Sequence, residues 1–309
     1  MPQEDENKFK KSNVPAKAGE SSWLTTPTFI RHIFDKFPLV THPLNELPHR
    51  QPIERNENTL YIFAPEGDAQ RGAPSFNPSC LKWQTYLKLA GIDFVTVASN
   101  NHASPTGSLP FVIPAASNAD ATILDLVRPI PSHKIQEWAG KHGATSRAEP
   151  DRTRYEAYLS LLDHRIRNAW LHTLYLSGSN FEAVARPLYI SPATSAPPAR
   201  LALSYSLRTS ALEELTRAST SSVIDLSALY RESDDAFSAL SELLGDDDWF
   251  FGEAEPGFFD AAVFAYTHLL CDENMGWKTE EERLGRSLRG GKWKNLVEHE
   301  RRVFDRCYR

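Results

Sequence analysis

Cysteine and long apolar runs are scarce in this sequence of 309 residues. Its three cysteines, Cys80, Cys271 and Cys307, lie far apart, and such an odd, scattered set argues against a disulfide framework and favours a reducing compartment. We expect ordinary thiols, at least two of them buried. The longest apolar run, from Phe258 to Cys271, contains an aspartate and a histidine and falls short of the roughly 20 residues that cross a bilayer. We therefore expect no direct membrane span.

Segments that would direct the chain to nucleic acid, lipid or the secretory route are also missing. The 34 basic and 40 acidic residues give a net charge of −6, and there is no basic stripe with interleaved aromatic residues. The N-terminus is acidic, which is not typical of a secretory signal. No glycine follows Met1, and Cys307 is third, not fourth, from the end, so lipidation is not expected. If the chain lies at a membrane, we expect another protein to hold it there.

Common catalytic and metal-binding motifs are absent as well. His-Glu-x-x-His and Gly-x-Ser-x-Gly do not occur, and the ten histidines do not pair with cysteines or acids at zinc-ligand spacing. The stretch Gly67 to Gly72 has no Gly-Lys-Ser/Thr, so it cannot hold a nucleotide as a P-loop does. Asp246 to Asp248 lacks the spacing of a calcium loop and is predicted to be a solvated turn after Gly245. The residues predict no metal site and no cofactor.

The N-terminal part differs in character from the rest of the chain. Residues 1–20 are polar and rich in Lys and Glu, which is typical of a disordered tail. Residues 21–57 form an arm in which large apolar side chains lie among prolines. Within this arm, Thr28 to Phe37 has apolar residues at helical spacing, and Pro27 is placed to start a helix. The pattern predicts one short amphipathic helix followed by an extended, proline-rich segment.

Residues 58–145 alternate between strand and helix patterns. One helix is marked clearly, because Asn77 is a good N-cap, Pro78 suits the first helical position and Gly91 closes the C-terminus. Its apolar face comprises Cys80, Trp83, Leu87 and Ala90. Strands are predicted at Thr59–Ala64, Asp93–Val97, Leu109–Ile113 and Ala121–Val127, a turn-rich stretch at Pro65–Ser75, and a second helix at Pro131–His142 with Ile135 and Trp138 inward.

Residues 150–309 show helical patterns only. A long amphipathic helix is predicted from the spacing of Tyr155, Leu159, Leu162, Ile166, Trp170 and Leu174. Further helices are predicted around Leu201–Ala218, Ser233–Leu244, Asp260–Cys271 and Lys292–Cys307, with a connection rich in proline and serine at Ser191–Pro198. Gly257 is a possible N-cap with Asp260 three residues later, directly before a helix that is apolar nearly all round. We expect that helix to be the core of this half.

This order of elements resembles the thioredoxin-like N-terminal domain and the all-helical C-terminal domain of glutathione transferases, a fold of α/β plus all-α class. Within that superfamily, the stretches SFNPSCLKWQTYLKLAGIDF, GSLPFVI, LLDHRIRNAWLHTLYLS and PGFFDAAVFAYTHLL resemble the metaxin family. The similar stretches reach from Thr59 to about Cys271. The resemblance implies a cis peptide bond before Pro110.

The residues that chemistry on this fold requires are missing. Redox members of the thioredoxin superfamily carry a cysteine of low pKa where this chain has Asn77, and Cys80 matches only the second position of such a motif. A transferase needs an acid followed by serine at the last helix of the first domain, where this chain has Pro131 and a serine. Tyr61 and Ser79 remain as candidates to activate a thiol, so the alternative is a divergent glutathione-dependent transferase.

The resemblance implies a binding role. Metaxin-like subunits lie on the cytosolic face of the mitochondrial outer membrane, bound to an Omp85-type barrel and to a second metaxin-like protein, and they help to assemble β-barrel precursor proteins. The transferase fold has no core position for the apolar residues of the arm. We therefore expect the arm to bind a partner, a hypothesis that concerns Trp23, Phe29, Ile33, Phe34 and Phe37. The alternative is that the arm wraps this chain's own surface, in whole or in part.

Overall fold

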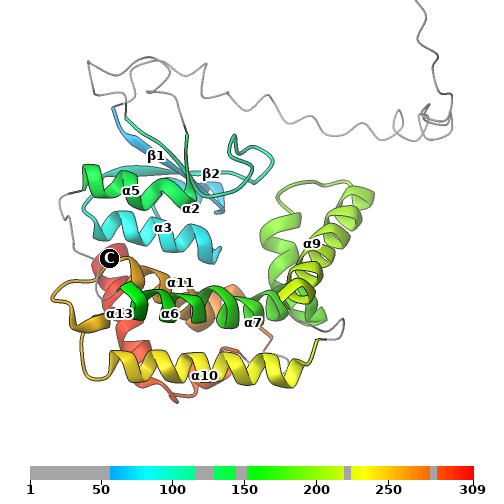
Figure 1. Ribbon diagram of the computed structural model, residues 1–309. Helices are drawn as coiled ribbons and strands as arrows, with labels where there is room; N and C mark the ends of the chain where they lie inside the picture. The colour runs from blue at the N-terminus through cyan, green and yellow to red at the C-terminus, as the bar shows by residue number, and fades with distance from the viewer. Residues whose placement is uncertain (1–55, 116–128, 144–151, 219–223, 279–283) are drawn as a thin grey trace, which may run out of the picture. The chain divides into compact units, whose positions relative to one another are not determined.

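The computed structural model describes residues 56–115, 129–143, 152–218, 224–278 and 284–309. Figure 1 shows a sheet with helices against it and a larger helical part. The predicted arm with Trp23, Phe29, Ile33, Phe34 and Phe37 lies outside the described residues, as does the predicted strand Ala121–Val127. Both remain predictions.

Within the described ranges, four short strands form one mixed sheet in the order β2-β1-β3-β4. They are β1 (Asn58–Ile62), β2 (Phe94–Ala98), β3 (Phe111–Ile113) and β4 (Ile130–Pro131). β2 runs parallel to β1, whereas β3 is antiparallel to both β1 and β4. The first three strands agree with the predicted ones to within a few residues.

Helix α3 (Pro78–Leu89) forms as predicted from its local signals. The side chain of Asn77 accepts a hydrogen bond from the backbone N–H of Cys80 at 3.1 Å, and Gly91 has a φ of +69°, which favours glycine. The predicted face, Cys80, Trp83, Leu87 and Ala90, is buried against the sheet. Helix α5 (Ser132–His142) packs beside it through buried Ile135 and half-buried Trp138.

The connections around the sheet differ from the prediction in two places. The stretch predicted as turns contains a short helix, α2 (Glu66–Gln70), which buries Ala69 against β2. Pro131 belongs to β4 and not to α5, because its main chain pairs with β3 at Phe111. The Leu109–Pro110 peptide bond is cis, as the resemblance implied.

A long helix with two wider turns opens the helical half. It runs through α6 (Arg152–Ser160), η2 (Leu161–Ile166), α7 (Arg167–Leu171) and η3 (His172–Leu176), of which η2 and η3 are π-helical. The buried residues Leu162, Ile166, Trp170 and Leu174 recur at every fourth position. That spacing exceeds the 3.6 residues of an α-helical turn. The wider turns thus keep the apolar stripe on one side.

The remaining helices complete this half. They are α8 (Gly178–Asn180), η4 (Phe181–Ile190), α9 (Pro197–Ala218), α10 (Leu226–Leu244), η5 (Phe250–Gly252), α11 (Phe258–Cys271), η6 (Glu273–Met275), α12 (Arg286–Arg289) and α13 (Lys294–Tyr308). Helices α9 and α10 begin earlier than predicted. In the first turns of α10, Leu226, Leu229 and Tyr230 continue the apolar spacing at exposed or half-buried positions. The helix starts at Asp225, which accepts hydrogen bonds from the N–H groups of Ser227 and Ala228.

Helix α11 is the core of the helical half, as predicted, with buried side chains on every face. Its start depends on the buried carboxylate of Asp260. Oδ2 of Asp260 accepts from the N–H of Gly257 at 2.8 Å, and Oδ1 accepts from the N–H of Phe250 at 3.1 Å. Nε2 of fully buried His299 lies 2.9 Å from the same Oδ1. The carboxylate therefore ties three separate segments together.

Helix α3 joins the sheet to the helical half. The ring of Phe258, the first residue of α11, packs against Trp83 and Tyr86 with centroid distances of 4.9 and 5.4 Å. Near the end of α13, the hydroxyl of Tyr308 lies 2.9 Å from Oγ1 of Thr85. The sheet and the helices from Asn58 onward therefore pack as one unit.

The burial of the cysteines differs from the prediction. Of the three cysteines only Cys80 is fully buried, whereas Cys271 and Cys307 are half-buried, so the expectation of at least two buried thiols is wrong. Both lie near helix ends, where neighbouring segments cover them only in part. Across the described ranges, no helix is long and apolar enough to span a bilayer.

Candidate functional site

The N-terminus of α3 is the place where this fold would hold a reactive group. The loop before it is fixed by Ser75, whose hydroxyl donates to the carbonyl oxygen of Phe63 and accepts from the N–H of Asn77. Buried Gln84 accepts from the N–H of Ser75 at 3.0 Å and donates to the carbonyl oxygen of Ala73 at 2.8 Å. The end of β1 and the start of α3 are thereby held at a fixed separation.

Cys80 lies one turn into α3 and is sealed from solvent. Its sulfur accepts a hydrogen bond from the N–H of Phe63 at 3.5 Å. Burial raises the pKa of the Cys80 thiol from 9.0 to about 12. The thiolate is the reactive form of cysteine, so at neutral pH this thiol is inert. The prediction that Cys80 is a buried core residue is confirmed.

Both polar atoms of the Asn77 side chain make hydrogen bonds within the fold. Oδ1 caps the helix, and Nδ2 donates to the hydroxyl of Tyr189 at 3.1 Å. Tyr189 belongs to η4 and meets Phe63 and Phe76 edge-on, with centroid distances of 5.3 and 5.0 Å, while Tyr175 lies 5.9 Å away. An aromatic cluster from both halves of the chain therefore lies at the start of α3. We call it the Tyr189 cluster: Phe63, Phe76, Tyr175 and Tyr189.

Both tyrosines of the Tyr189 cluster stay neutral. Burial raises the pKa of Tyr175 to about 12, and burial likewise holds the pKa of Tyr189 well above its ordinary value. Activating a thiol requires a group that stabilises the thiolate. These phenols are neutral, and Asn77 already binds the hydroxyl of Tyr189. The cluster can pack and hydrogen-bond, but it has no base or nucleophile for transfer chemistry.

The other candidates from the sequence serve structural purposes. The ring of Tyr61 stacks on Phe111 of β3, at a centroid distance of 4.5 Å and an angle of 8°. Ser79 is exposed on the first turn of α3. At the start of α5, Pro131 is the N-cap and makes no side-chain cap bond. The structure does not bring these residues together into a polar site.

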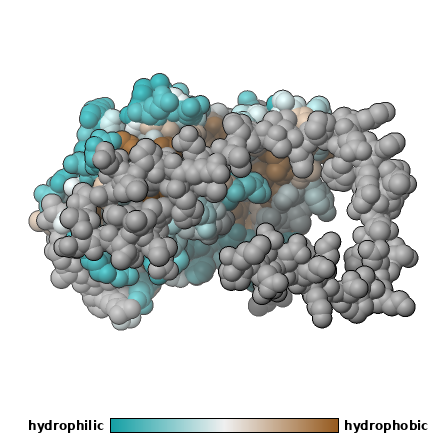
Figure 2. All heavy atoms as spheres, turned by 90° about the horizontal axis from the view of Figure 1, so that it is seen from above, coloured by the Kyte–Doolittle hydropathy of each residue, from teal (hydrophilic) through white to brown (hydrophobic). Residues whose placement is uncertain are grey.

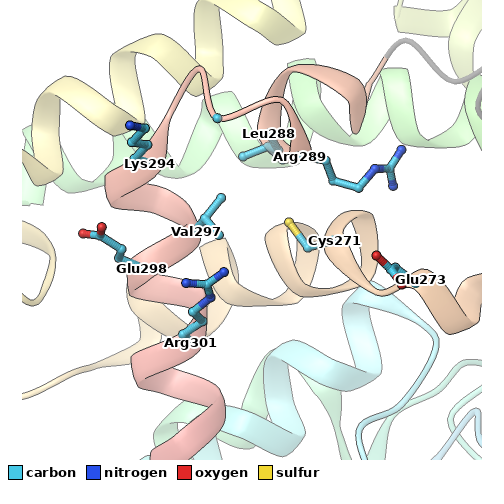
Figure 3. Close-up of a pocket in the computed structure, with 9 residues that line it drawn as sticks. Cys271, Glu273, Leu288, Arg289, Lys294, Val297, Glu298 and Arg301 are labelled. Atoms are coloured by element: carbon cyan, nitrogen blue, oxygen red, sulfur yellow. The ribbon is translucent and has the colours of Figure 1, made fainter.

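A hollow lies between the end of α11, α12 and the start of α13. Its volume is about 420 Å³. Figure 3 shows Cys271, Leu288 and Val297 facing it from three different elements. Charged side chains of both signs also line it: Glu273, Arg289, Lys294, Glu298 and Arg301.

The chemistry of this hollow is limited. Nη1 of Arg289 donates to the carbonyl oxygen of Leu270 at 2.7 Å and so caps the end of α11. Cys271 has no histidine beside it in the lining to act as a base. Within the described part of the chain, no group of three or more His, Cys, Asp or Glu side chains could hold a metal ion. The described residues of the hollow offer mixed charge around an apolar floor and include no reactive group of side chains.

Sequence reasoning did not find the Tyr189 cluster. Asn77 and Tyr189 are 112 positions apart in the sequence. The local signal in the stretch around Tyr189 is only an aromatic residue beside apolar ones, which is typical of ordinary helix packing. Such a contact follows from the packing of η4 against the residues that precede α3.

Family comparisons agree with this architecture. Residues 78–180 match the model of the glutathione S-transferase N-terminal domain, and residues 233–303 match that of the glutathione S-transferase C-terminal domain. Glutathione transferase GSTFuA3 from Phanerochaete chrysosporium superposes with a TM-score of 0.53 at 13% identity, covering 82% of this chain and 98% of that one. A glutathione S-transferase of Ceriporiopsis subvermispora in complex with glutathione gives 0.50 at 13% identity, covering 81% and 98%. The chain has a glutathione-transferase-like fold; at this identity the structures show the fold alone.

Within proteins of this fold, the sequence of the chain is similar to metaxins. Metaxin-1 of Homo sapiens is 28% identical over 210 residues, which are 66% of this chain and 43% of the human protein. Metaxin-1 of Mus musculus is 26% identical over 210 residues, 66% of this chain and 63% of the mouse protein. Metaxin-3 of Xenopus laevis is 29% identical over 203 residues, which are 63% of this chain and 62% of the frog protein. The chain is similar to the metaxins, and the similar stretch spans between about two fifths and two thirds of the length of these relatives.

Proposed function

We propose that this chain is a non-enzymatic subunit of the machinery that inserts and assembles β-barrel proteins in the mitochondrial outer membrane. The observation that carries the proposal is its similarity to metaxins over about two thirds of its length. A finer resemblance supports it. The stretches WLTTPTFIRHIFDKFPLVTHPLNELPHR and LYISPATSAPPARL resemble the fungal thirty-five-kilodalton subunit of the sorting and assembly machinery.

The start of α3 supports a role without catalysis. A thiolate at a helix N-terminus is stabilised by free N–H groups and by the helix dipole. Here the N-cap is Asn77, which satisfies the N–H of Cys80, and the adjoining space is occupied by Tyr189. The nearest thiol is buried and has a raised pKa. The fold thus serves as a scaffold for contacts with other proteins.

The proposed partners are an Omp85-type barrel, a second metaxin-like subunit and the incoming barrel precursors, whose terminal β-signal this chain helps to recognise. The proposed place is the cytosolic face of the outer membrane, with attachment through protein. Purified chain should therefore stay at the bottom of a flotation gradient with protein-free liposomes of outer-membrane lipid composition. Recovery in the lipid fraction at physiological salt would contradict attachment through protein.

The main experiment is affinity purification of the tagged chain from solubilised mitochondria. The expected result is co-purification of one barrel subunit and one further transferase-like chain. If the tagged chain is recovered folded and without either, the assembly role is wrong. Immobilised glutathione tests the alternative of a glutathione-dependent transferase. We expect the chain in the flow-through, and specific elution with free glutathione would favour that alternative.

The arm supplies a sharper test of the partner contacts. We propose that the predicted stripe Phe29, Ile33, Phe34 and Phe37 contributes to the interface with the complex. Truncating several interface anchors to Ala costs a few kcal/mol, which lowers affinity by orders of magnitude. The quadruple variant should lose the barrel in the pull-down while its melting temperature changes little. If the variant melts early and its folded fraction still binds the barrel, the arm belongs to this chain's own core.

A further inference from the structure

Among the described strands β2 forms one edge of the sheet, and its own residues supply no charge, proline or bulge to protect that edge. It pairs with β1 alone in the strand order. Edge strands present a row of free main-chain groups, and soluble proteins usually protect them with charged residues, proline or a bulge. The five residues Phe94-Val95-Thr96-Val97-Ala98 include no charge and no proline. Their pairing with β1 is regular, with no bulge in the register.

The pairing shows which amides face outward. The N–H of Ser99 donates to the carbonyl oxygen of Ile62 at 2.9 Å, so the main chain of Ser99 is turned toward β1. Main-chain groups alternate in direction along a strand. The N–H and C=O groups of Phe94, Thr96 and Ala98 therefore point away from β1. Among the described residues these groups have no hydrogen-bond partner.

The side chains of β2 divide between a covered and an open face. Thr96 is buried, and its hydroxyl donates to the carbonyl oxygen of Ala69 in α2. On the opposite face, Val95 and Val97 are 41% and 38% exposed. Figure 2 shows apolar surface on the side of the molecule seen from above, beside hydrophilic areas. The edge thus combines unpaired amides with an apolar strip on one face.

From this arrangement we propose that the β2 edge binds an extended peptide segment with apolar residues at alternate positions, which adds a fifth strand to the sheet. A strand is the occupant that fits, because it supplies N–H and C=O groups at the same spacing as the free ones on β2. Its alternate apolar side chains would meet Val95 and Val97 on one face. A helix satisfies its own main-chain groups and would leave these amides unpaired. The peptide site is inferred from the free main-chain groups and exposed valines of β2 alone. Its identification with a site for the β-signal of a barrel precursor rests on the proposed function.

The probe is a fluorescent peptide of alternating valine and threonine, with flanking lysines for solubility, titrated into the full chain by anisotropy. A second peptide of the same sequence carries N-methyl groups on the amides of one edge, which removes the donors and keeps the side chains. We expect the N-methylated peptide to bind about tenfold more weakly or worse. Hydrogen–deuterium exchange should show protection of the amides of Phe94, Thr96 and Ala98 with the first peptide only. Equal binding of both peptides would overturn the proposal.

Two variants of the chain test the two parts of the edge separately. Val95→Lys with Val97→Lys removes the apolar strip and adds charge to exposed positions, whereas Ala98→Pro removes one outward N–H and leaves the ladder to β1 intact. Each should weaken peptide binding by about tenfold. A matched control is Leu201→Lys with Tyr205→Lys on α9, which replaces two exposed apolar residues far from the sheet in sequence.

The outcomes separate this inference from the proposed function. If the α9 control weakens binding as much as the β2 variants, the peptide recognises apolar surface in general and the β2 proposal falls. If β2 becomes protected only in a concentration-dependent dimer and no peptide binds, a second copy is the occupant and the proposal is wrong. Co-purification of the barrel is measured on the same variants. A β2 variant that loses the peptide but keeps the barrel leaves the assembly role standing and supports a separate peptide site.

Discussion

The buried carboxylate of Asp260 should contribute more to stability than any other single polar group described above. It accepts hydrogen bonds from the N–H groups of Phe250 and Gly257, and Nε2 of His299 lies 2.9 Å away. In Asp260→Ala the N–H of Phe250 and Nε2 of His299 would remain buried without an acceptor, the half-buried N–H of Gly257 would lose its partner, and α11 would lose its N-terminal cap. An unsatisfied buried donor costs about 1–3 kcal/mol and a lost cap about 1 kcal/mol.

Partial relaxation and water entry reduce that total, so we expect Asp260→Ala to lower the free energy of unfolding by about 3–5 kcal/mol. For a protein of this size such a change lowers the melting temperature by roughly 10 °C. The assay is thermal and urea unfolding followed by circular dichroism. His299→Ala and the double variant complete a double-mutant cycle, and contact between the two side chains predicts a non-additive result.

A matched control separates this network from general sensitivity of the helix start. Asp272 also accepts from a nearby backbone N–H, that of Asn274, but at an exposed turn. Asp272→Ala should therefore cost well under half as much as Asp260→Ala. If the two variants are equally stable, or if Asp260→Ala costs less than about 1 kcal/mol, the burial argument is wrong.

Three further predictions concern the joint between the sheet and the helices. The free energy of unfolding should fall as pH rises from about 9 toward 12, because Cys80 ionises in the unfolded chain while burial keeps it protonated in the folded state. The variant Cys80→Ala should show a smaller fall in urea titrations, and it should still co-purify with the barrel. Tyr189→Phe removes the bond from Asn77 and should cost about 1 kcal/mol in unfolding experiments without creating retention on immobilised glutathione. Phe258→Ala should destabilise by about 2 kcal/mol and raise hydrogen exchange in α3 first, since its ring packs against Trp83 and Tyr86; uniform exchange across the chain would contradict that order.

Elements with local signals could be predicted from the sequence. Helix α3 has its cap, its proline and its closing glycine within fifteen consecutive residues, and each signal acts on neighbouring main-chain groups. The start of α11 is similar, because Gly257 and Asp260 lie one turn apart. In both cases the interaction that decides the boundary is short-range, so a single sequence contains it.

Elements that depend on distant contacts could not be predicted this way. Helix α2 buries a single residue, Ala69, and owes its place to contact with β2. Pro131 pairs with Phe111, so the boundary between β4 and α5 depends on a strand twenty residues earlier. The burial of Cys271 and Cys307 likewise depends on how completely neighbouring helices cover them. The sequence pattern shows which residues are apolar, and tertiary packing decides how far each is covered.

The start of α3 explains why loss of a catalytic residue need not weaken the fold. A cysteine that serves as a reactive thiolate must keep nearby N–H groups available and its sulfur open to solvent. Asn77 instead uses its oxygen to cap the helix and its amide to bind Tyr189 of the helical half. Each bond of this kind contributes about 1 kcal/mol. A position that in redox members of the thioredoxin superfamily favours a reactive thiolate here favours hydrogen bonds that join the two halves of the fold, as expected if the proposed non-enzymatic role is correct.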